Sequence, residues 1–263
     1  MKVNRKKKLG SLLLILLVVS ACAAPANNQP GVTETASAQS TSTELSSSTE
    51  LCSNRYFPVR EGATWTYKNS GSPAGEFQFT DRVSSVRADG FTLTSQLGNT
   101  AWTQEWACQQ EGLVALQLGG APAMTLTAQG VQLNLAVNNV SGVTFPRDII
   151  AGNQWQHNLD FDGQVEMAGQ SGNAQGTALT RFTVLGNETV TVPAGTFEAV
   201  KIQVEPTLDI NVGFQLLSIP VTISGTYTYW FVQDVGWVKA SGAGNFAGQT
   251  LSETIELQSY HVP

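Results

Sequence analysis

Val200-Lys-Ile202-Gln-Val204 and Leu208-Asp-Ile210-Asn-Val212 each alternate apolar and polar residues. Side chains two positions apart in a β-strand lie on the same face of the sheet, so this alternation buries one face and leaves the other in water. The pattern recurs in many short segments after Cys52, for example Val131-Gln-Leu133-Asn-Leu135-Ala-Val137 and Tyr227-Thr-Tyr229. No stretch shows convincing helical periodicity. We therefore predict an all-β, mainly antiparallel domain.

Short intervals rich in Gly, Asn and Asp separate these segments, as in hairpins. A chain of 263 residues, 41% of them hydrophobic, can bury a substantial core, and about 200 residues is a usual size for one domain. We expect that domain to occupy residues 52–263. It should be a sandwich or, alternatively, a curved sheet of the half-barrel kind.

Two parts of the chain share landmarks at similar spacing. The first unit contains Phe57-Pro58, Gly62, Trp65, Trp106, Gln109, Gly112 and Val114, and the second contains Phe145-Pro146, Gly152, Trp155, Trp230, Gln233, Gly236 and Val238. Matched spacing favours two pseudo-repeated units in which equivalent strands take equivalent places. Coincidence is the alternative, because chance matches are common in a Gly- and Thr-rich sequence.

The N-terminus combines three features of a secretory signal. Basic residues crowd positions 2–8, an apolar run follows at 12–19, and small residues precede Cys22. The apolar run is too short to span a bilayer as a mature helix. Since the four residues ending in Cys22 resemble the lipobox of bacterial lipoproteins, we predict a signal peptide over residues 1–21 and lipidation of Cys22. The alternative is an ordinary signal cut near Ala24, with an incidental cysteine.

Residues 22–51 form the predicted tether between the lipid and the domain. From Ala26 to Glu50 the sequence is mostly Asn, Gln, Ser, Thr, Ala and Glu, with almost no large apolar residue to offset the entropy of ordering. Two or three acyl chains anchor a protein stably without help from its folded part. We therefore expect the protein at the cell membrane or the outer membrane, lipid-anchored and facing the extracytoplasmic side.

The charge of the chain argues against nucleic acid as a partner. The formal net charge is −6, but five of the fourteen basic residues precede Cys22. The rest of the chain has nine Lys and Arg against twenty Asp and Glu, and the nine are scattered without a run. Proteins that bind phosphate groups depend on clustered cations, so we expect neither nucleic acid nor anionic lipid headgroups as direct ligands.

Three cysteines are present, and lipidation of Cys22 would leave Cys52 and Cys108 as a pair. A disulfide is the expected state in an oxidising compartment, and by loop closure such a bridge contributes on the order of 4 kcal/mol. Two free thiols are the alternative. A metal site is disfavoured, because two cysteines without a nearby histidine are a poor ligand set.

Candidate catalytic residues are few, and we expect no enzyme activity, no cofactor and no metal site. His157 occupies a polar strand position that is typical of a surface, and His261 lies two residues from the end. The sequence has no Gly-x-Ser-x-Gly elbow, no His-Glu-x-x-His and no phosphate-cradling loop. Asp160 and Asp162 share one strand face, as a glycosidase pair would, but twenty acids make such neighbours common.

Aromatic residues are the better functional lead. Our candidate ligand-binding residues are Trp65, Trp106, Trp155 and Trp230. On alternating strands such rings could line a groove for an acyl chain or stack on sugars. The stronger alternative is that they only fill the space between layers of a large sheet. The apolar segment 214–220 is either a lid over a cavity or a buried strand.

Three motifs together give a resemblance to a known group. They are Tyr56-Phe57-Pro58 with Gly62-x-x-Trp65-x-Tyr67, then Thr191-Val-Pro-Ala-Gly-Thr-Phe-Glu-Ala-Val-Lys201, then Tyr229-Trp230-Phe231 with Val235-Gly236-Trp237-Val238. This set resembles a broad group of bacterial envelope lipoproteins. Several of them are expected to share the β half-barrel of the carriers and receptors of the lipoprotein-localisation pathway. The sequence departs from those factors in lacking clear helices to plug the sheet.

The resemblance implies a concave apolar face suited to a lipid or a hydrophobic partner. We therefore expect a non-catalytic binding module with two partners, the membrane through its lipid anchor and a lipid or other hydrophobic ligand. The alternative is an envelope structural or interaction protein that recognises glycan or protein through surface aromatics.

Overall fold

The computed structural model describes residues 51–167, 169–214, 217–246 and 249–263. All of them belong to one compact unit, Ser42–Pro263. The predicted signal peptide, Cys22 and all of the tether but Leu51 lie outside the described residues.

One antiparallel sheet of thirteen strands makes up most of the described part of the chain, which confirms the predicted all-β class. The strands and the helix are β1 (Thr64–Ser70), β2 (Phe77–Arg87), β3 (Gly90–Leu97), β4 (Thr100–Cys108), β5 (Gly112–Ala115), α2 (Gly120–Ala128), β6 (Val131–Gly142), β7 (Phe145–Pro146), β8 (Gln154–Met167), β9 (Gln170–Val192), β10 (Gly195–Phe214), β11 (Leu217–Val232), β12 (Gly236–Phe246) and β13 (Gln249–His261). The segments quoted for their alternation fall in β6, β10 and β11.

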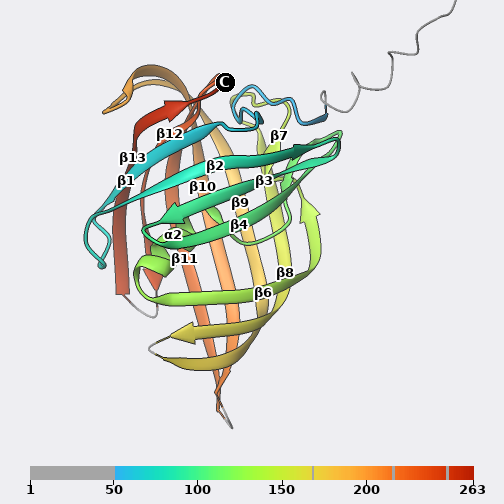
Figure 1. Cartoon of the computed structure of the whole chain (residues 1–263), viewed down its shortest axis with the longest axis vertical. Coiled ribbons are helices and arrows are strands. Elements are labelled where there is room, and N and C mark those ends of the chain that lie inside the picture. Colours follow the sequence, from blue (N-terminus) through green and yellow to red (C-terminus); the bar gives the residue numbers. More distant parts are fainter. Residues whose placement is uncertain (1–50, 168, 215–216, 247–248) are drawn as a thin grey trace, which may run out of the picture. The chain divides into compact units, whose positions relative to one another are not determined.

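The sheet curls into a half-barrel, as one of the two predicted architectures required. Its strands follow the order β6-β8-β9-β10-β11-β12-β13-β1-β2-β3-β4-β5-β7. In Figure 1 the shorter strands β2, β3 and β4 cross in front of the long strands β9, β10 and β11. Inward-facing side chains of both groups pack in a shared core.

Two meanders of five strands each account for ten of the thirteen strands, and their order follows the predicted repeat. Strands β1 to β5 form the first and β8 to β12 the second, each with consecutive neighbours. The turn before each meander is held in the same way. The Gly62 N–H donates to Val83 O at 2.9 Å, and the Gly152 N–H donates to Val184 O at 3.0 Å. The landmarks Gly62 and Gly152 therefore take equivalent places in the two units. Trp106 lines an interior cavity, whereas Trp230 does not.

The strands β6 and β13 follow the first and the second meander, and each connects the two meanders. The two connections differ. Strand β13 is hydrogen-bonded to β12 on one side and to β1 on the other. Strand β6 is hydrogen-bonded to β8, whereas β5, beyond its pairing with β4, pairs only with the two residues of β7. The two edges of the sheet, β6 and β7, thus belong to one continuous segment, 131–146.

Residues 142–146 close the sheet at one end, and we call them the seam. The Val143 N–H donates to Gln156 O of β8 at 3.1 Å, and the Thr144 N–H donates to Leu113 O of β5 at 3.0 Å. Gly142 precedes them with a φ of 78°, and a Cβ there would meet Gln156 O at 2.1 Å. Glycine is required because the chain must turn and approach β8 closely.

Helix α2 contradicts the expectation that the domain has no clear helix. It follows β5, and in Figure 1 it lies between β4 and β6, which are not neighbours in the sheet. Ala123, Met124 and Thr125 are consecutive and all buried, so the helix is covered on more than one side. A helix buried in this way has no one-sided apolar stripe, and it also lacks a side-chain cap. Both usual sequence signals were therefore missing.

The buried side chains divide into two clusters. The first, the aromatic core, includes Trp65, Tyr67, Phe79, Phe91, Trp106, Phe145 and Phe231. The second, the aliphatic core, consists of Val131, Leu159, Phe161, Val165, Ala174, Ala178, Ile210 and Val212. The second cluster lies on β6 and on the halves of β8, β9 and β10 that lead away from the seam.

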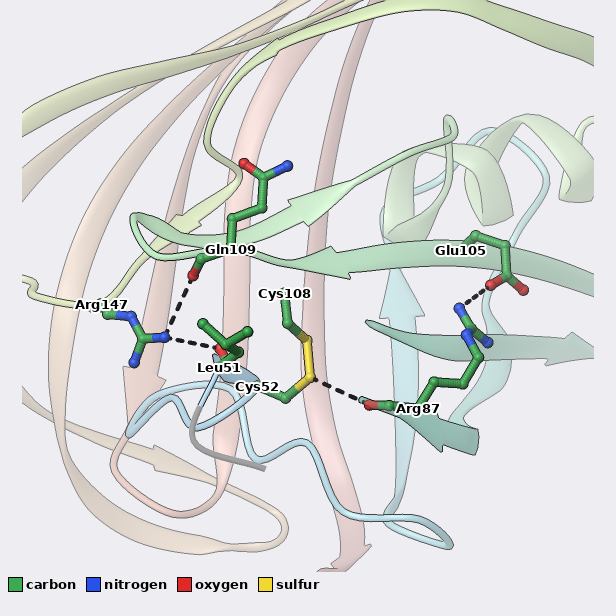
Figure 2. Close-up of a disulfide and its surroundings, with 7 residues drawn as sticks. All are labelled: Leu51, Cys52, Arg87, Glu105, Cys108, Gln109 and Arg147. Atoms are coloured by element: carbon green, nitrogen blue, oxygen red, sulfur yellow. Dashed lines mark hydrogen bonds and ion pairs between the residues drawn. A yellow bond between two sulfur atoms is a disulfide. The ribbon is translucent and has the colours of Figure 1, made fainter. Parts of the chain in front are cut away.

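The predicted disulfide between Cys52 and Cys108 is confirmed. It joins the segment before β1 to the end of β4, with the two Cα atoms 4.9 Å apart (Figure 2). Around it, Arg147 Nη2 donates to Leu51 O at 3.2 Å and to Gln109 O at 3.4 Å. The bridge and these bonds fix the entry of the chain into the sheet at the seam end.

Candidate functional site: a line of interior chambers

Four cavities lie inside the curled sheet, with volumes of about 230, 180, 170 and 120 Å³. We name them the aromatic, middle, side and aliphatic chambers, in that order. An apolar cavity of about 150 Å³ in a protein interior stays dry and binds small apolar molecules. Each chamber is therefore of a size to accept part of an apolar ligand.

The aromatic chamber draws its walls from both units of the sheet. Its aromatic lining is Phe57, Trp65, Tyr67, Trp106, Phe145, Phe182, Tyr229, Phe231 and Trp237. The rings are held in place: Tyr67 stacks on Trp237 with ring centroids 3.8 Å apart and donates its hydroxyl to Trp237 O at 3.0 Å. Such a wall is preformed, which lowers the entropic cost of binding.

Shared walls link the chambers into one line. Ala178 and Thr180 line both the aromatic and the middle chamber. Leu133 and Leu208 line both the middle and the aliphatic chamber. Phe182 is common to the aromatic and the side chamber. The arrangement suits a long, narrow occupant better than a compact one.

The aliphatic chamber is lined by apolar side chains alone and reaches the surface of the sheet. Met167 and Ile219 belong to its lining and are 46% and 44% exposed. Both lie next to the hairpin turns that join β8 to β9 and β10 to β11. The aliphatic chamber therefore borders solvent at this end of the sheet.

Segment 214–220 belongs to this end of the sheet. The described residues place it at the turn from β10 to β11, where Leu217 is 68% exposed. Phe214 and Ile219 line the aliphatic chamber. The described residues of the segment are the end of β10 and the exposed start of β11, so of the two predictions the buried strand is wrong.

Asp81 places a carboxyl group in the wall of the aromatic chamber. It lies on β2 between Phe79 and Val83 in the inward-facing series, and it is 4% exposed. Ser95 Oγ donates to Asp81 Oδ1 at 2.5 Å. Burial raises the pKa of Asp81 from 3.8 to about 6, and the Ser95 hydrogen bond opposes this rise.

His157 is also in this wall, which corrects the expectation of a surface position. The residue is 6% exposed and shares its inward side of β8 with Leu159 and Phe161. Burial lowers its pKa, and a hydrogen bond to the backbone of Ala115 opposes that shift. Nε2 of the ring has no hydrogen-bond partner. The polar neighbours in sequence point outward, so they misled the prediction.

A second polar group lies where the side and middle chambers meet. Glu253 of β13 lines both and is 8% exposed. Its Oε2 accepts hydrogen bonds from Asn69 Nδ2 at 2.8 Å and from Thr125 Oγ1 at 3.0 Å. These bonds connect β13, β1 and α2, and so they hold the helix against the sheet.

The four candidate tryptophans are not brought together. Trp65 and Trp106 are buried and line the aromatic chamber. Trp155 stacks on Phe182 with centroids 5.1 Å apart and is not part of any chamber wall.

Trp230 lies on the opposite face of β11. Its Nε1 donates to Glu188 Oε2 at 3.2 Å, and the ammonium groups of Lys201 and Lys239 each lie 5.9 Å from a ring centroid. The two ammonium groups lie near the ring and reduce the area of its face that could stack on a sugar.

Asp160 and Asp162 face away from the chambers. Each accepts a hydrogen bond from an amide of β6, Asn139 Nδ2 to Asp160 at 2.9 Å and Asn138 Nδ2 to Asp162 at 2.7 Å. Within the described residues no group of three or more His, Cys, Asp or Glu side chains is placed to hold a metal ion. Over the same residues, no helix is both long and apolar enough to cross a membrane.

The polar wall residues Asp81, Gln104, His157 and Glu253 were missed at the level of sequence. One signal could have found them: each shares strand parity with buried apolar neighbours, as Asp81 does with Phe79 and Val83. A polar residue in the inward series of an alternating strand must lie in the interior.

An antiparallel sheet curled around apolar chambers places the chain among the β half-barrel proteins. A family model described as DUF3108-like matches residues 103–254, more than half of the chain. The chain belongs to this DUF3108-like family. It matches no curated protein.

Solved structures with a related outline are distant. A protein described as exported and of YmcC-like fold, from Bacteroides fragilis NCTC 9343, is 14% identical, with 80% of this chain and 100% of that chain covered and a TM-score of 0.47. A protein described as a lipoprotein from Parabacteroides distasonis ATCC 8503 is 15% identical over 79% and 99%, with a TM-score of 0.45. YmcC of Escherichia coli K12, described as a hypothetical lipoprotein, is 10% identical, with 84% of this chain and 91% of that chain covered and a TM-score of 0.36.

These likenesses are too distant to assign a function to the chain. A relationship to the lipoprotein-localisation factors is not among them and stays a prediction.

Proposed function

We propose that this protein is a lipid-anchored extracytoplasmic lipoprotein that binds a lipid or another hydrophobic ligand inside its curled sheet, without catalysis. The observation that carries the proposal is the line of four linked chambers. Protein interiors normally have few voids larger than a water molecule, because unfilled apolar space forfeits dispersion contacts. A row of adjoining apolar spaces of this kind is typical of a binding site.

Entry would be at the aliphatic end, where Met167 and Ile219 are both exposed and part of the chamber wall. Apolar side chains at two hairpin ends lower the cost of moving an alkyl chain from a membrane or a micelle into the sheet. The head of the ligand would follow the line toward the aromatic chamber or stay at the entry.

Ligand binding is tested with the mature chain, residues 22–263, carrying Cys22→Ser so that no acyl chain is attached. The purified protein is extracted with organic solvent for mass spectrometry and titrated with N-phenyl-1-naphthylamine, an uncharged fluorescent apolar probe. We expect a co-purified lipid or saturable probe binding. An empty protein that does not bind the probe would overturn the proposal.

A matched pair of variants localises the binding. Ala178 faces the junction of the aromatic and middle chambers, whereas its neighbour Thr177 is exposed. Ala178→Phe should weaken probe binding, and Thr177→Phe should leave it unchanged. Equal effects of the two substitutions would place the probe elsewhere.

The anchor is tested separately, because Cys22 lies outside the described residues. In cells, Cys22→Ser should release the protein from the membrane fraction, since two or three acyl chains supply the anchoring energy. If the altered protein still sediments with membranes, acylation of Cys22 is not what holds it there.

A further inference from the structure

The charges around the four chambers all have one sign. None of the nine Lys and Arg residues among the described residues lines a chamber. Two acidic residues do, Asp81 in the aromatic chamber and Glu253 between the side and middle chambers. The site therefore offers no counter-ion to a buried anion.

The chamber walls offer hydrogen-bond acceptors to a head group. His157 uses one ring nitrogen on the backbone of Ala115, and Nε2, which has no partner, is left to accept a hydrogen bond in the neutral ring. Carboxylate oxygens of Asp81 and Glu253 are acceptors by nature. Two donors in the wall of the aromatic chamber are already used, because Gln104 Nε2 donates to Gln117 O at 2.7 Å and the Tyr67 hydroxyl donates to Trp237 O at 3.0 Å.

We propose that the occupant is an amphiphile whose head group donates hydrogen bonds and carries no negative charge, such as a long-chain alcohol or amine, with its head beside Asp81 and His157 in the aromatic chamber. This inference rests on the proposed function. Moving an ion into a protein interior without a partner is strongly unfavourable, and a neighbouring carboxylate adds repulsion. A phosphate or carboxylate head would meet both penalties here.

The position of the tail follows from the contrast between the chambers. The aliphatic chamber is lined by apolar side chains alone, so nothing there would bind a head group. The head is therefore placed at the aromatic end and the alkyl chain toward Met167 and Ile219, along the walls shared at Ala178 and Leu208.

Three probes of equal chain length test the inference: dodecylamine, 1-dodecanol and dodecanoate, below their micellar concentrations at pH 8. Each competes with N-phenyl-1-naphthylamine for the mature Cys22→Ser chain. We expect the amine and the alcohol to displace the fluorophore at concentrations at least about tenfold lower than dodecanoate, the ratio that about 1.4 kcal/mol gives. Equal or better displacement by dodecanoate would overturn the inference and leave the proposed function intact.

Two further outcomes are also decisive. If the fluorophore binds and none of the three competes, the occupant is not an aliphatic amphiphile and the inference is wrong. If the fluorophore does not bind and no lipid co-purifies, the proposed function fails, and this inference fails with it.

A pair of carboxylates provides the control. Asp81→Asn removes the charge in the chamber and should narrow the gap between amine and dodecanoate. Asp89→Asn removes a charge from an exposed turn and should leave the gap unchanged. If Asp81→Asn does not fold, the ranking of the three probes on the unaltered site still decides the matter.

Discussion

The aromatic core and the aliphatic core belong to one sheet, yet they are fixed in different ways. The aromatic core holds stacked rings, side-chain hydrogen bonds to the backbone such as Trp65 Nε1 to Val235 O, and the nearby disulfide. The aliphatic core consists of Val, Leu, Ile and Ala side chains with one buried ring, Phe161, and it borders the chamber that reaches the surface. The comparison teaches that the aromatic end is fixed by specific contacts around the largest chamber, whereas the described residues of the aliphatic end have no such contacts and border solvent.

The same division follows from the joints of the two units. Where β13 is bonded on both sides, the wall is complete. Where β6 meets only β8, helix α2 takes the place of a strand neighbour, and the middle chamber lies beside it with Leu126 in its wall. The middle chamber thus lies at the joint where the two units meet unequally.

The largest effect should come from the disulfide at the aromatic end. Replacing Cys52 and Cys108 with Ser lets a loop of 56 residues open in the unfolded state, which lowers the free energy of unfolding by about 4 kcal/mol. Urea denaturation followed by tryptophan fluorescence measures the loss. A change below about 1 kcal/mol would show that the entry segment contributes little to the aromatic core.

Replacing Asp81 should raise the free energy of unfolding, and the size of the effect should depend on pH. Its pKa rises from 3.8 to about 6 on folding, so the folded protein binds the proton more tightly than the unfolded chain does. Stability contributed by the protonated group is present below pH 4 and is lost as the pH rises to about 6. Asp81→Asn should therefore raise the free energy of unfolding at pH 7, by at most about 3 kcal/mol.

The control for this prediction is the pH profile itself. The difference between Asp81→Asn and the unaltered protein should grow between pH 4 and 6 and then level off, whereas Asp89→Asn should show no such step. A difference that is constant from pH 4 to 8 would mean that the carboxylate is solvated in the folded protein.

Paired leucine substitutions compare the two cores directly. Leu113 is 1% exposed in the aromatic core, whereas Leu208 is half-buried and already borders two chambers. Leu113→Ala should cost about 3 kcal/mol and Leu208→Ala about 1 kcal/mol, because a site beside existing space loses fewer contacts. Thermal unfolding by circular dichroism checks the order. Equal losses would mean that the aliphatic end is packed as tightly as the aromatic end.

The smallest effect on stability is expected from filling the aliphatic chamber. Val212 lines it, and Asn211 beside it is exposed on the other face of β10. Val212→Phe should change the free energy of unfolding by less than about 1 kcal/mol, because the ring can enter the cavity. It should also shorten the longest alkyl alcohol that displaces the fluorophore, and Asn211→Phe should not. If the longest alcohol that displaces the fluorophore stays the same, the aliphatic chamber is not part of the binding site.

Alternation along the strands was sufficient to predict the class of the fold, because a residue and its second neighbour face the same side in every strand. Fixed spacing around Gly62 and Gly152 predicted the repeat, and the two turns are held by equivalent hydrogen bonds. With Cys22 assigned to lipidation, two of the three cysteines were left, and this predicted the disulfide between Cys52 and Cys108. These features depend on local pattern or on composition, which a single sequence displays.

Features that depend on how distant segments meet were not predictable in this way. Helix α2 is stabilised by contacts with β13 and β1 through Thr125, so its own sequence carries no stripe or cap. Of the candidate tryptophans, Trp65 faces a chamber and Trp230 faces outward. The sequence alone made the two equally good candidates for ligand binding. His157 was assigned by its neighbours in sequence, whereas its surroundings are set by the strand face.

Segment 131–146 supplies both edge strands of the sheet, and this affects how the protein behaves in concentrated solution. In an open sheet two bare strand edges can template the addition of further chains and lead to fibres. Here both ends of the sheet are parts of one segment, and the seam turns it from β8 to β5. Strand β7 is only two residues long, which leaves the flank of β6 as the longer of the two edges, so this β-rich polypeptide should resist edge-to-edge self-association.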